Sequence, residues 1–306
     1  MWEMESGQCR AVLRGHTGLV WQVVFSPDGT RLASCAHDKT VRLWDLRTAQ
    51  TFYTLPGHSE PVLALTFSPD GSLLATGGYN RALRLWNAHT AQALHTLPQS
   101  RRICSIAFHP GGEIVATGDG DYVVRLRDGR TGQLIRTLAG HERDVWGLSF
   151  SRTGTLLASS SGDHTVRLWD TETGECRAIL RDHTGWVQSV AFHPDGTLLA
   201  SASQDRTIRL WDVASTRKGE NNSALMTLSG HLDRVTSVAF SPKTGLLASA
   251  SVDETIRLWN VQTGECLHVV RIPGPYAGMN IIGARGITLA QRVALKTLGA
   301  VEVVDD

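Results

Sequence analysis

Serine, histidine and aspartate recur together along this chain of 306 residues. A serine hydrolase combines these three residue types as nucleophile, general base and orienting acid. Five histidines recur at similar positions along the chain, and most of them are followed by a serine and an aspartate. These histidines are His16, His58, His141, His183 and His231. Because a catalytic site occurs once in a chain, a set that recurs in this way is expected to be structural. The chain also has no Gly-x-Ser-x-Gly elbow, no phosphate-binding loop and no His-Glu-x-x-His motif.

Charge and cysteine usage narrow the classes of ligand. Lys and Arg total 30 and Asp and Glu total 29, so a net charge of +1 offers no strong field for a membrane surface or a nucleic acid. The cysteines are scattered singly, without a Cys-x-x-Cys pair, and we expect neither a metal nor a cofactor. Their odd number favours a reducing compartment. Together with an amino end that lacks the features of a secretory signal, this predicts a cytoplasmic location.

An internal repeat of about 42 residues is the strongest feature of the sequence. The string LASxSxDxTVRLWD recurs, exactly or with changes, in six copies that end at Asp45, Asn87, Asp128, Asp170, Asp212 and Asn260. Each copy contains four short runs of apolar and β-branched residues, separated by turns such as Pro-Asp-Gly. Four strands per repeat predict an antiparallel meander. One such sheet cannot bury both of its faces alone, so radial stacking of the sheets predicts an all-β propeller.

The six copies together resemble the WD-repeat (β-transducin-like) family. The histidine marker, the Ser and Asp of the second strand and its turn, and the Trp-Asp end are in register over roughly residues 8 to 271. The resemblance implies a buried hydrogen-bonded tetrad of His, Ser or Thr, Asp and Trp in each blade. The complete sets, followed by that of the second blade in which Asn replaces Asp, are His16, Ser34, Asp38 and Trp44; His141, Ser159, Asp163 and Trp169; His183, Ser201, Asp205 and Trp211; His231, Ser249, Asp253 and Trp259; and His58, Thr76, Asn80 and Trp86. The third blade keeps Thr117 and Asp121 but has Ser100 and Arg127 where His and Trp are expected.

The two ends of the chain depart from this pattern. Residues 8–14 and 265–271 both resemble fourth strands, which gives a count of 25, one more than six closed blades need and three fewer than seven. We therefore expect a domain of residues 1–271 that is either an imperfectly closed ring of six blades or has an incomplete seventh. Residues 272–306 form a tail with a predicted short helix from Leu289 to Leu298. This tail resembles one that follows propellers in bacterial signalling NTPases of the NB-ARC/STAND class, which implies a bacterial signalling context.

The family resemblance implies a non-catalytic scaffold or sensor module that binds a protein or peptide. Its ligands commonly dock on the face that carries the histidine loops. Three positions per blade are expected to point there: two at the start of the first strand and one just before the tetrad aspartate. The residues that we expect to bind the partner are Trp21, His37, Leu63, Tyr79, Arg102, Asp144, Trp146, Trp186, Gln188, Gln204, Arg234 and Thr236. An enzyme with a site in the channel and a nucleic-acid reader stay open as alternatives, whereas a small-molecule ligand is not expected.

Overall fold

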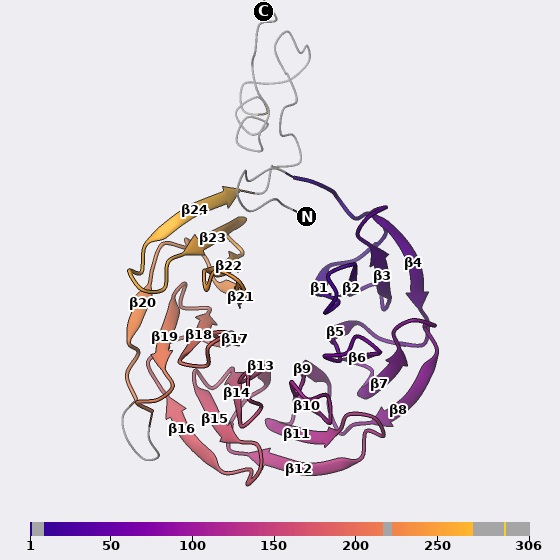
Figure 1. The fold of residues 1–306 in the computed structure, drawn as a ribbon, viewed down its shortest axis with the longest axis horizontal. Helices are drawn as coiled ribbons and strands as arrows, with labels where there is room; N and C mark the ends of the chain where they lie inside the picture. Colours follow the sequence, from indigo (N-terminus) through magenta and orange to yellow (C-terminus); the bar gives the residue numbers. More distant parts are fainter. Residues whose placement is uncertain (2–8, 217–221, 272–290, 292–306) are drawn as a thin grey trace, which may run out of the picture.

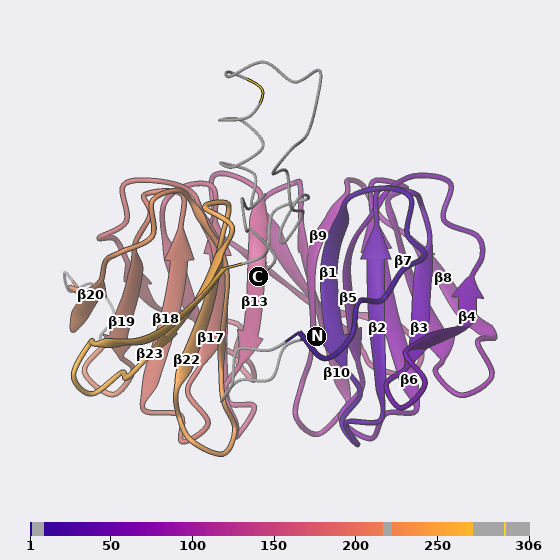
Figure 2. The ribbon, with the colours of Figure 1, turned by 90° about the horizontal axis from the view of Figure 1, so that it is seen from above.

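The computed structural model describes Met1, residues 9–216 and 222–271, and Gln291. Within these residues the chain forms six four-stranded antiparallel sheets that stand around a central axis as the blades of a propeller (Figure 1). In every blade four consecutive strands pair in chain order, with the first strand innermost and the fourth outermost. Seen from the side, the blades form a disc through which the strands run from one face to the other (Figure 2). The predicted all-β propeller is therefore confirmed, with six blades.

The strand bounds show how regularly the repeat is used. The strands of blades 1 to 3 are β1 (Val20–Phe25), β2 (Arg31–Ala36), β3 (Val41–Asp45), β4 (Gln50–Leu55), β5 (Val62–Phe67), β6 (Leu73–Gly78), β7 (Ala82–Asn87), β8 (Ala93–Pro98), β9 (Ile103–Phe108), β10 (Ile114–Asp119), β11 (Val123–Asp128) and β12 (Leu134–Ala139). Those of blades 4 to 6 are β13 (Val145–Phe150), β14 (Leu156–Ser161), β15 (Val166–Asp170), β16 (Cys176–Leu180), β17 (Val187–Phe192), β18 (Leu198–Ser203), β19 (Ile208–Asp212), β20 (Met226–Leu228), β21 (Val235–Phe240), β22 (Leu247–Ser251), β23 (Thr255–Trp259) and β24 (Cys266–Arg271).

Two kinds of turn shape each blade. Between β1 and β2, Gly29 has a φ of 69°, and Asp28 Oδ1 accepts a hydrogen bond of 3.0 Å from the Thr30 amide. The turn between the second and third strands instead places a non-glycine residue at positive φ in every blade, at Lys39, Arg81, Tyr122, His164, Arg206 and Glu254. Such a conformation is uncommon for non-glycine residues. Because the blades repeat one path, these six side chains stand at the same face of the disc.

Apolar side chains shared between neighbouring blades form the core. Between blades 1 and 2, Ala33 and Leu43 pack with Val62 and Leu65 of β5, and all four are fully buried. Burial of one aliphatic side chain contributes about 1.5–3 kcal/mol. Equivalent clusters join blades 2 and 3, 3 and 4, 4 and 5, and 5 and 6. The innermost strands of blades 2 to 5 are thus fixed in position by contacts with both neighbouring blades.

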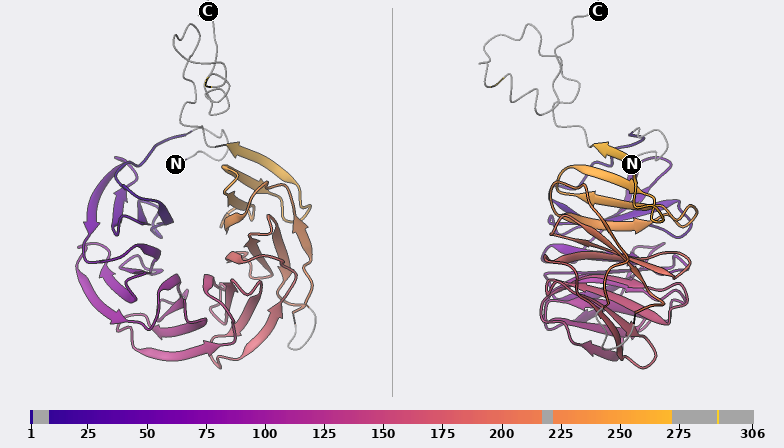
Figure 3. Two further views of the ribbon diagram at one scale, coloured as in Figure 1. Left: turned by 180° about the vertical axis from the view of Figure 1, so that it is seen from behind. Right: turned by 90° about the vertical axis from the view of Figure 1, so that its left-hand side faces the viewer.

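The ring is open between blade 6 and blade 1 (Figures 1 and 3). On β1, Val23 is 53% exposed and Phe25 is 60% exposed. At the same positions of β5, Leu65 is 0% exposed and Phe67 is 6% exposed. None of the apolar clusters formed by the described residues joins blade 6 to blade 1. We call this place the ring opening.

One expectation about the ends is corrected. The described residues 9–14 form no strand, so the leading strand expected at residues 8–14 and the count of 25 are wrong; the described part of the chain has 24 strands. The physical reason is that every blade already receives its outermost strand from its own repeat, including β24 in blade 6. The tail expected at 272–306 and its helix fall, apart from Gln291, outside the described residues.

Candidate partner-binding face and the buried tetrads

Four of the expected tetrads are closed hydrogen-bond networks. In blade 4, His141 Nδ1 lies 2.7 Å from Asp163 Oδ2, and His141 Nε2 lies 2.7 Å from Ser159 Oγ. Trp169 Nε1 donates to the same hydroxyl over 2.8 Å. In blades 1, 5 and 6 the equivalent distances lie between 2.7 and 2.9 Å. These sets are His16, Ser34, Asp38 and Trp44; His183, Ser201, Asp205 and Trp211; and His231, Ser249, Asp253 and Trp259.

Each network has the connectivity of a Ser-His-Asp triad but not its accessibility. Ser159 and Ser201 are 0% exposed. Their hydroxyl groups already accept the tryptophan N–H. A nucleophile must be reached by the substrate carbonyl and must lie beside an oxyanion site. The burial of the serines and the repetition of the set favour a role in holding the second and third strands of these four blades to the loop before the first strand.

The tetrad aspartates are held in the ionised form. Burial opposes ionisation of Asp38, but hydrogen bonds from Thr40, the Thr17 amide and His16 outweigh it and lower the pKa to about 2. The same balance of burial against hydrogen bonds, those from histidine among them, lowers the pKa of the other three well below its usual range, at Asp163, Asp205 and Asp253.

Blade 2 keeps only part of the network. His58 Nε2 lies 2.8 Å from Thr76 Oγ1, which also accepts the Trp86 N–H over 2.8 Å. Because Asn80 replaces the aspartate, His58 Nδ1 and Asn80 Oδ1 are buried without a hydrogen-bond partner. Burial, together with the positive charge of Arg84, lowers the pKa of His58 to about 4.

Blade 3 replaces the tetrad with an ion cluster. Arg125 binds Asp119 and also donates to Asp121 Oδ2 over 2.6 Å. Ser100 Oγ donates to the same aspartate over 2.5 Å, as the histidines of blades 1, 4, 5 and 6 do through Nδ1. The Trp position is filled by Arg127, which donates to Gln99 Oε1 over 2.7 Å. Burial raises the pKa of Asp119 to about 6, with Arg125 acting in the opposite direction.

The ion cluster of blade 3 forms around Arg125 because this arginine has no indole ring beside it. The other blades also carry an arginine two residues before the tryptophan, and four of these lie over the indole ring; Arg42, for example, is 6.0 Å from the Trp44 ring centroid. In blade 3 no indole is present, and Arg125 turns instead to the two carboxylates. The sequence indicated that blade 3 lacks the Trp and the His of the tetrad. It did not indicate the ion cluster, because the cluster depends on Asp119, which lies outside the tetrad at a position where the other blades have Ala, Gly or Ser.

The positions expected to bind a partner are brought together in pairs. The residue before the tetrad aspartate donates its amide to the residue that precedes the first strand, as Gln204 does to the Trp186 carbonyl over 2.9 Å. The same bond occurs in all six blades, and its other pairs are His37 and Leu19, Tyr79 and Pro61, Gly120 and Arg102, Gly162 and Asp144, and Val252 and Arg234. Because the blades repeat, all pairs lie on one face of the disc, which we call the histidine-loop face.

Four of these side chains form a continuous row across blades 2 to 5. Arg102 Cζ lies 5.4 Å from the Tyr79 ring centroid and 6.0 Å from that of Trp146. Trp146 and Trp186 are stacked, with centroids 6.2 Å apart and an interplanar angle of 15°. Asp144 Oδ2 accepts a hydrogen bond of 2.7 Å from Arg102 Nη2. We call Tyr79, Arg102, Trp146 and Trp186 the aromatic–arginine ridge.

The remaining expected binding residues are placed less uniformly. Trp21, His37, Arg234 and Thr236 are exposed, and Trp21 borders the ring opening on β1. Gln188 and Gln204 are half-buried. Leu63 is only 6% exposed, so its side chain belongs to the core rather than the surface. This part of the expectation for Leu63 is wrong, because residues of β5 pack against both neighbouring blades.

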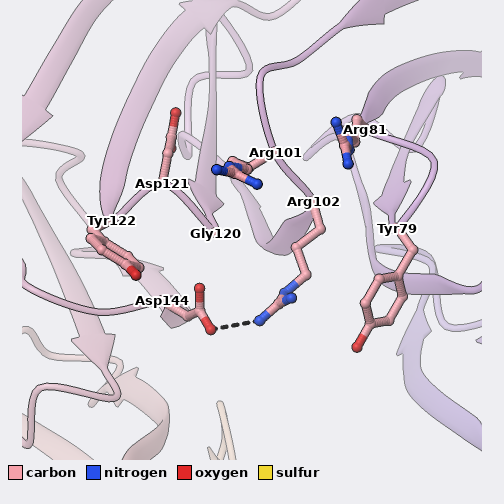
Figure 4. A pocket seen from close by; sticks show the side chains of 8 residues that line it. All are labelled: Tyr79, Arg81, Arg101, Arg102, Gly120, Asp121, Tyr122 and Asp144. Carbon is pink, nitrogen blue, oxygen red and sulfur yellow. Dashed lines mark hydrogen bonds and ion pairs between the residues drawn. The ribbon is translucent and has the colours of Figure 1, made fainter.

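A pocket next to the ridge was not predicted from the sequence. Its volume is about 530 Å³. It is lined by Tyr79, Arg81, Arg101, Arg102, Gly120, Asp121, Tyr122 and Asp144 (Figure 4). Arg81 and Tyr122 occupy the positive-φ position of the turn between the second and third strands. That position recurs in every repeat, so it was available as a sequence signal for surface side chains on this face.

Two other classes of site were searched for in the part of the chain that the structure describes. No group of three or more His, Cys, Asp or Glu residues is placed there to hold a metal ion. No described helix is long and apolar enough to cross a membrane.

Comparison with known protein families defines the class of protein. Six consecutive segments match the family described as WD domain, G-beta repeat, and they are residues 7–45, 49–87, 91–128, 132–170, 174–212 and 222–260. The matches cover most of the chain, so this protein belongs to the WD-repeat family, whose propellers are generally scaffolds for protein interactions and typically non-catalytic. A search of curated proteins finds no match.

Proposed function

We propose that this propeller is a non-catalytic module that binds a protein or peptide partner on its histidine-loop face, with the aromatic–arginine ridge as the main contact. The observation that carries the proposal is the continuity of the ridge from Tyr79 to Trp186 across four blades. Tyr79 is 41% exposed and Trp186 is 38% exposed. Tyr, Trp and Arg are the residue types that dominate binding energy at protein interfaces.

The energetics of the ridge favour specific binding of a partner over non-specific association. The two stacked indoles are already ordered by each other and by Arg102, so little side-chain freedom is lost when a partner docks. The ion pair between Arg102 and Asp144 fixes the guanidinium between the rings. A preorganised surface of this kind places its binding energy in a few residues rather than over a large area.

The domain boundaries, the signalling context and the location in the cell are part of the same proposal. The binding unit is residues 1–271, and residues 272–306 form a separate tail. The resemblance of the tail to those of bacterial NB-ARC/STAND-type proteins supports a sensor role in a bacterial signalling system. A cytoplasmic location is supported by the five cysteines, all of which are free: Cys9, Cys35, Cys104, Cys176 and Cys266.

The test is partner affinity for surface variants. A partner captured with the whole chain as bait is purified, and its affinity is measured for Trp186→Ala and Arg234→Ala. The control is Arg152→Ala, an exposed arginine in the β13–β14 turn on the opposite face. We expect at least a tenfold loss of affinity for Trp186→Ala, a smaller loss for Arg234→Ala and none for the control. Wild-type affinity of both Trp186→Ala and Arg234→Ala, together with loss of binding in Arg152→Ala, would show that the partner does not bind the histidine-loop face.

A further inference from the structure

The pocket beside the ridge is built where the chain departs most from its own repeat. It lies where blades 2 and 3 meet the edge of blade 4, and blade 3 is the blade without the histidine and tryptophan of the tetrad. The loop before β9 supplies Arg101 and Arg102 there. Sites at which local sequence rules fail in an otherwise consistent fold are the sites to examine for function.

The charged groups in this pocket are unequally satisfied. Asp144 is bound to Arg102, and Asp121 is bound to Arg125 and Ser100. The guanidinium groups of Arg81 and Arg101 have no ion pair with any residue of the described chain. Each guanidinium offers five N–H donors. The two aspartates are therefore already occupied as acceptors, while two arginines retain their full capacity to donate.

The geometry keeps these donors accessible. All three arginines line the pocket, and Figure 4 shows the guanidinium group of Arg102 between the rings of Tyr122 and Tyr79, with Arg101 and Arg81 along the upper side of the view. The two tyrosines are 45% and 41% exposed, respectively. Both unpaired arginines are exposed, so neither has to leave a buried contact before it binds a ligand.

A glycine leaves the pocket open. At Gly120, a Cβ atom would lie 3.0 Å from Arg102 Cγ and 3.3 Å from Asp144 Oδ1. The same position holds Tyr79 in blade 2 and Gln204 in blade 5. A side chain of that size at residue 120 would compete with the ion pair and fill the space. The absence of a side chain therefore preserves both the ion pair and the pocket.

We propose that this pocket is an anion-binding subsite that receives an oxyanion side chain, a carboxylate or a phosphate ester, carried by the protein partner. The proposal rests on the proposed function and names the chemistry of one contact. Guanidinium groups bind carboxylate and phosphate through charge-assisted, often paired hydrogen bonds. The net charge of the whole chain is only +1, so the attraction is local rather than a property of a basic surface. Tyr79 and Tyr122 would pack against the residues on either side of the anionic one.

The test uses three fluorescein-labelled nonapeptides that are identical except for a central glutamate, phosphoserine or glutamine. Anisotropy titrations compare the wild-type chain with the double variant Arg81→Ala/Arg101→Ala. The matched control is Arg143→Ala/Arg206→Ala, which removes the same charge from the corresponding positions of blades 4 and 5. We expect the glutamate or the phosphoserine peptide to bind the wild type at least tenfold more tightly than the glutamine peptide. The pocket variant should lose that advantage and the control should keep it.

The peptide titrations show which kind of anion binds, and they also show whether the subsite exists at all. Preference for glutamate identifies a carboxylate ligand, and preference for phosphoserine identifies a phosphorylated one; both support the subsite. Equal affinity of the three peptides, no binding of any up to millimolar concentration, or equal loss in the control double variant overturns it. If Trp186→Ala still abolishes partner binding in that case, the proposed function stands without the subsite. If charge-selective peptide binding persists while Trp186→Ala binds the partner normally, the subsite stands and the proposed ridge does not.

Discussion

At the scale of single residues, Asn80 and Asp163 form a natural comparison. They occupy the same position in blades 2 and 4, yet His58 Nδ1 has no hydrogen-bond partner, whereas His141 Nδ1 lies 2.7 Å from its aspartate. We expect Asn80→Asp to raise the free energy of unfolding by about 1–3 kcal/mol, because it satisfies a buried donor. The pKa of His58, now about 4, should rise.

The reciprocal substitution is the control for this prediction. Asp163→Asn should lower the free energy of unfolding by a similar amount, because it removes the acceptor from His141 and from the Glu142 amide. Urea unfolding measures both effects, and histidine NMR titration follows the pKa of His58. A destabilising effect of Asn80→Asp together with an unchanged pKa would contradict the structural role assigned to the tetrads.

The tetrad aspartates also predict how stability depends on pH. Asp38 has a folded pKa of about 2 against an ordinary value of 3.8, and three further tetrad aspartates are lowered as well. A depressed carboxyl pKa contributes stability above the unfolded value that is lost as the pH falls towards the folded value. We therefore expect the urea midpoint to fall steeply between about pH 4 and pH 2. Asp163→Asn should show a shallower fall, and identical pH profiles would argue against this origin.

At the scale of the blade, blade 3 differs from the others because an ion cluster replaces its tetrad. It lacks the buried indole that the other blades pack at this position, and truncation of a buried Trp typically costs about 3–5 kcal/mol. Its ion cluster includes Asp119, whose pKa is raised to about 6. A raised carboxyl pKa means that the folded state holds the proton more tightly, so this contribution to stability declines as the pH rises from about 4 to 6.

Hydrogen exchange tests this difference between blades. Amides in Ile103–Leu126 should exchange faster than those in Val187–Leu210 after correction for intrinsic rates. The difference should widen as the pH rises from about 4 to 6, and Asp119→Asn should remove the widening while keeping a buried polar side chain. Equal protection of the two blades at every pH would show that the Arg125 cluster fully replaces the tetrad.

The blades and four tetrads were predictable because every repeat carries the same signal at the same spacing. The pocket was not, because it depends on contacts between repeats: Arg102 of blade 3 pairs with Asp144 of blade 4. The leading strand was expected from its likeness to other fourth strands, although no blade had a free position for it. The burial of Leu63 was missed for a related reason, since a position that is exposed in one blade is covered in another according to its neighbours.

At the scale of the whole molecule, the ring opening separates otherwise equivalent positions. Phe25 on β1 is 60% exposed, and Phe67 at the same position of β5 is 6% exposed. We expect Phe67→Ala to lower the free energy of unfolding by about 3–5 kcal/mol, as is usual for a buried aromatic residue. Phe25→Ala should cost well under half as much, because most of its surface is already in water. Equal losses in urea unfolding would mean that the ring is closed in solution.

The histidine-loop face as the binding surface is the central claim, and a hydrogen-exchange footprint of the complex tests it most directly. The isolated chain and the chain saturated with its purified partner are compared peptide by peptide. We expect new protection in segments 77–82, 100–104, 143–147 and 184–188, which carry the ridge and the arginine residues of the pocket. We expect no change in the turns of the opposite face at residues 68–72, 109–113, 151–155 and 193–197. Protection confined to those opposite turns, with the ridge segments unchanged, would contradict the claim.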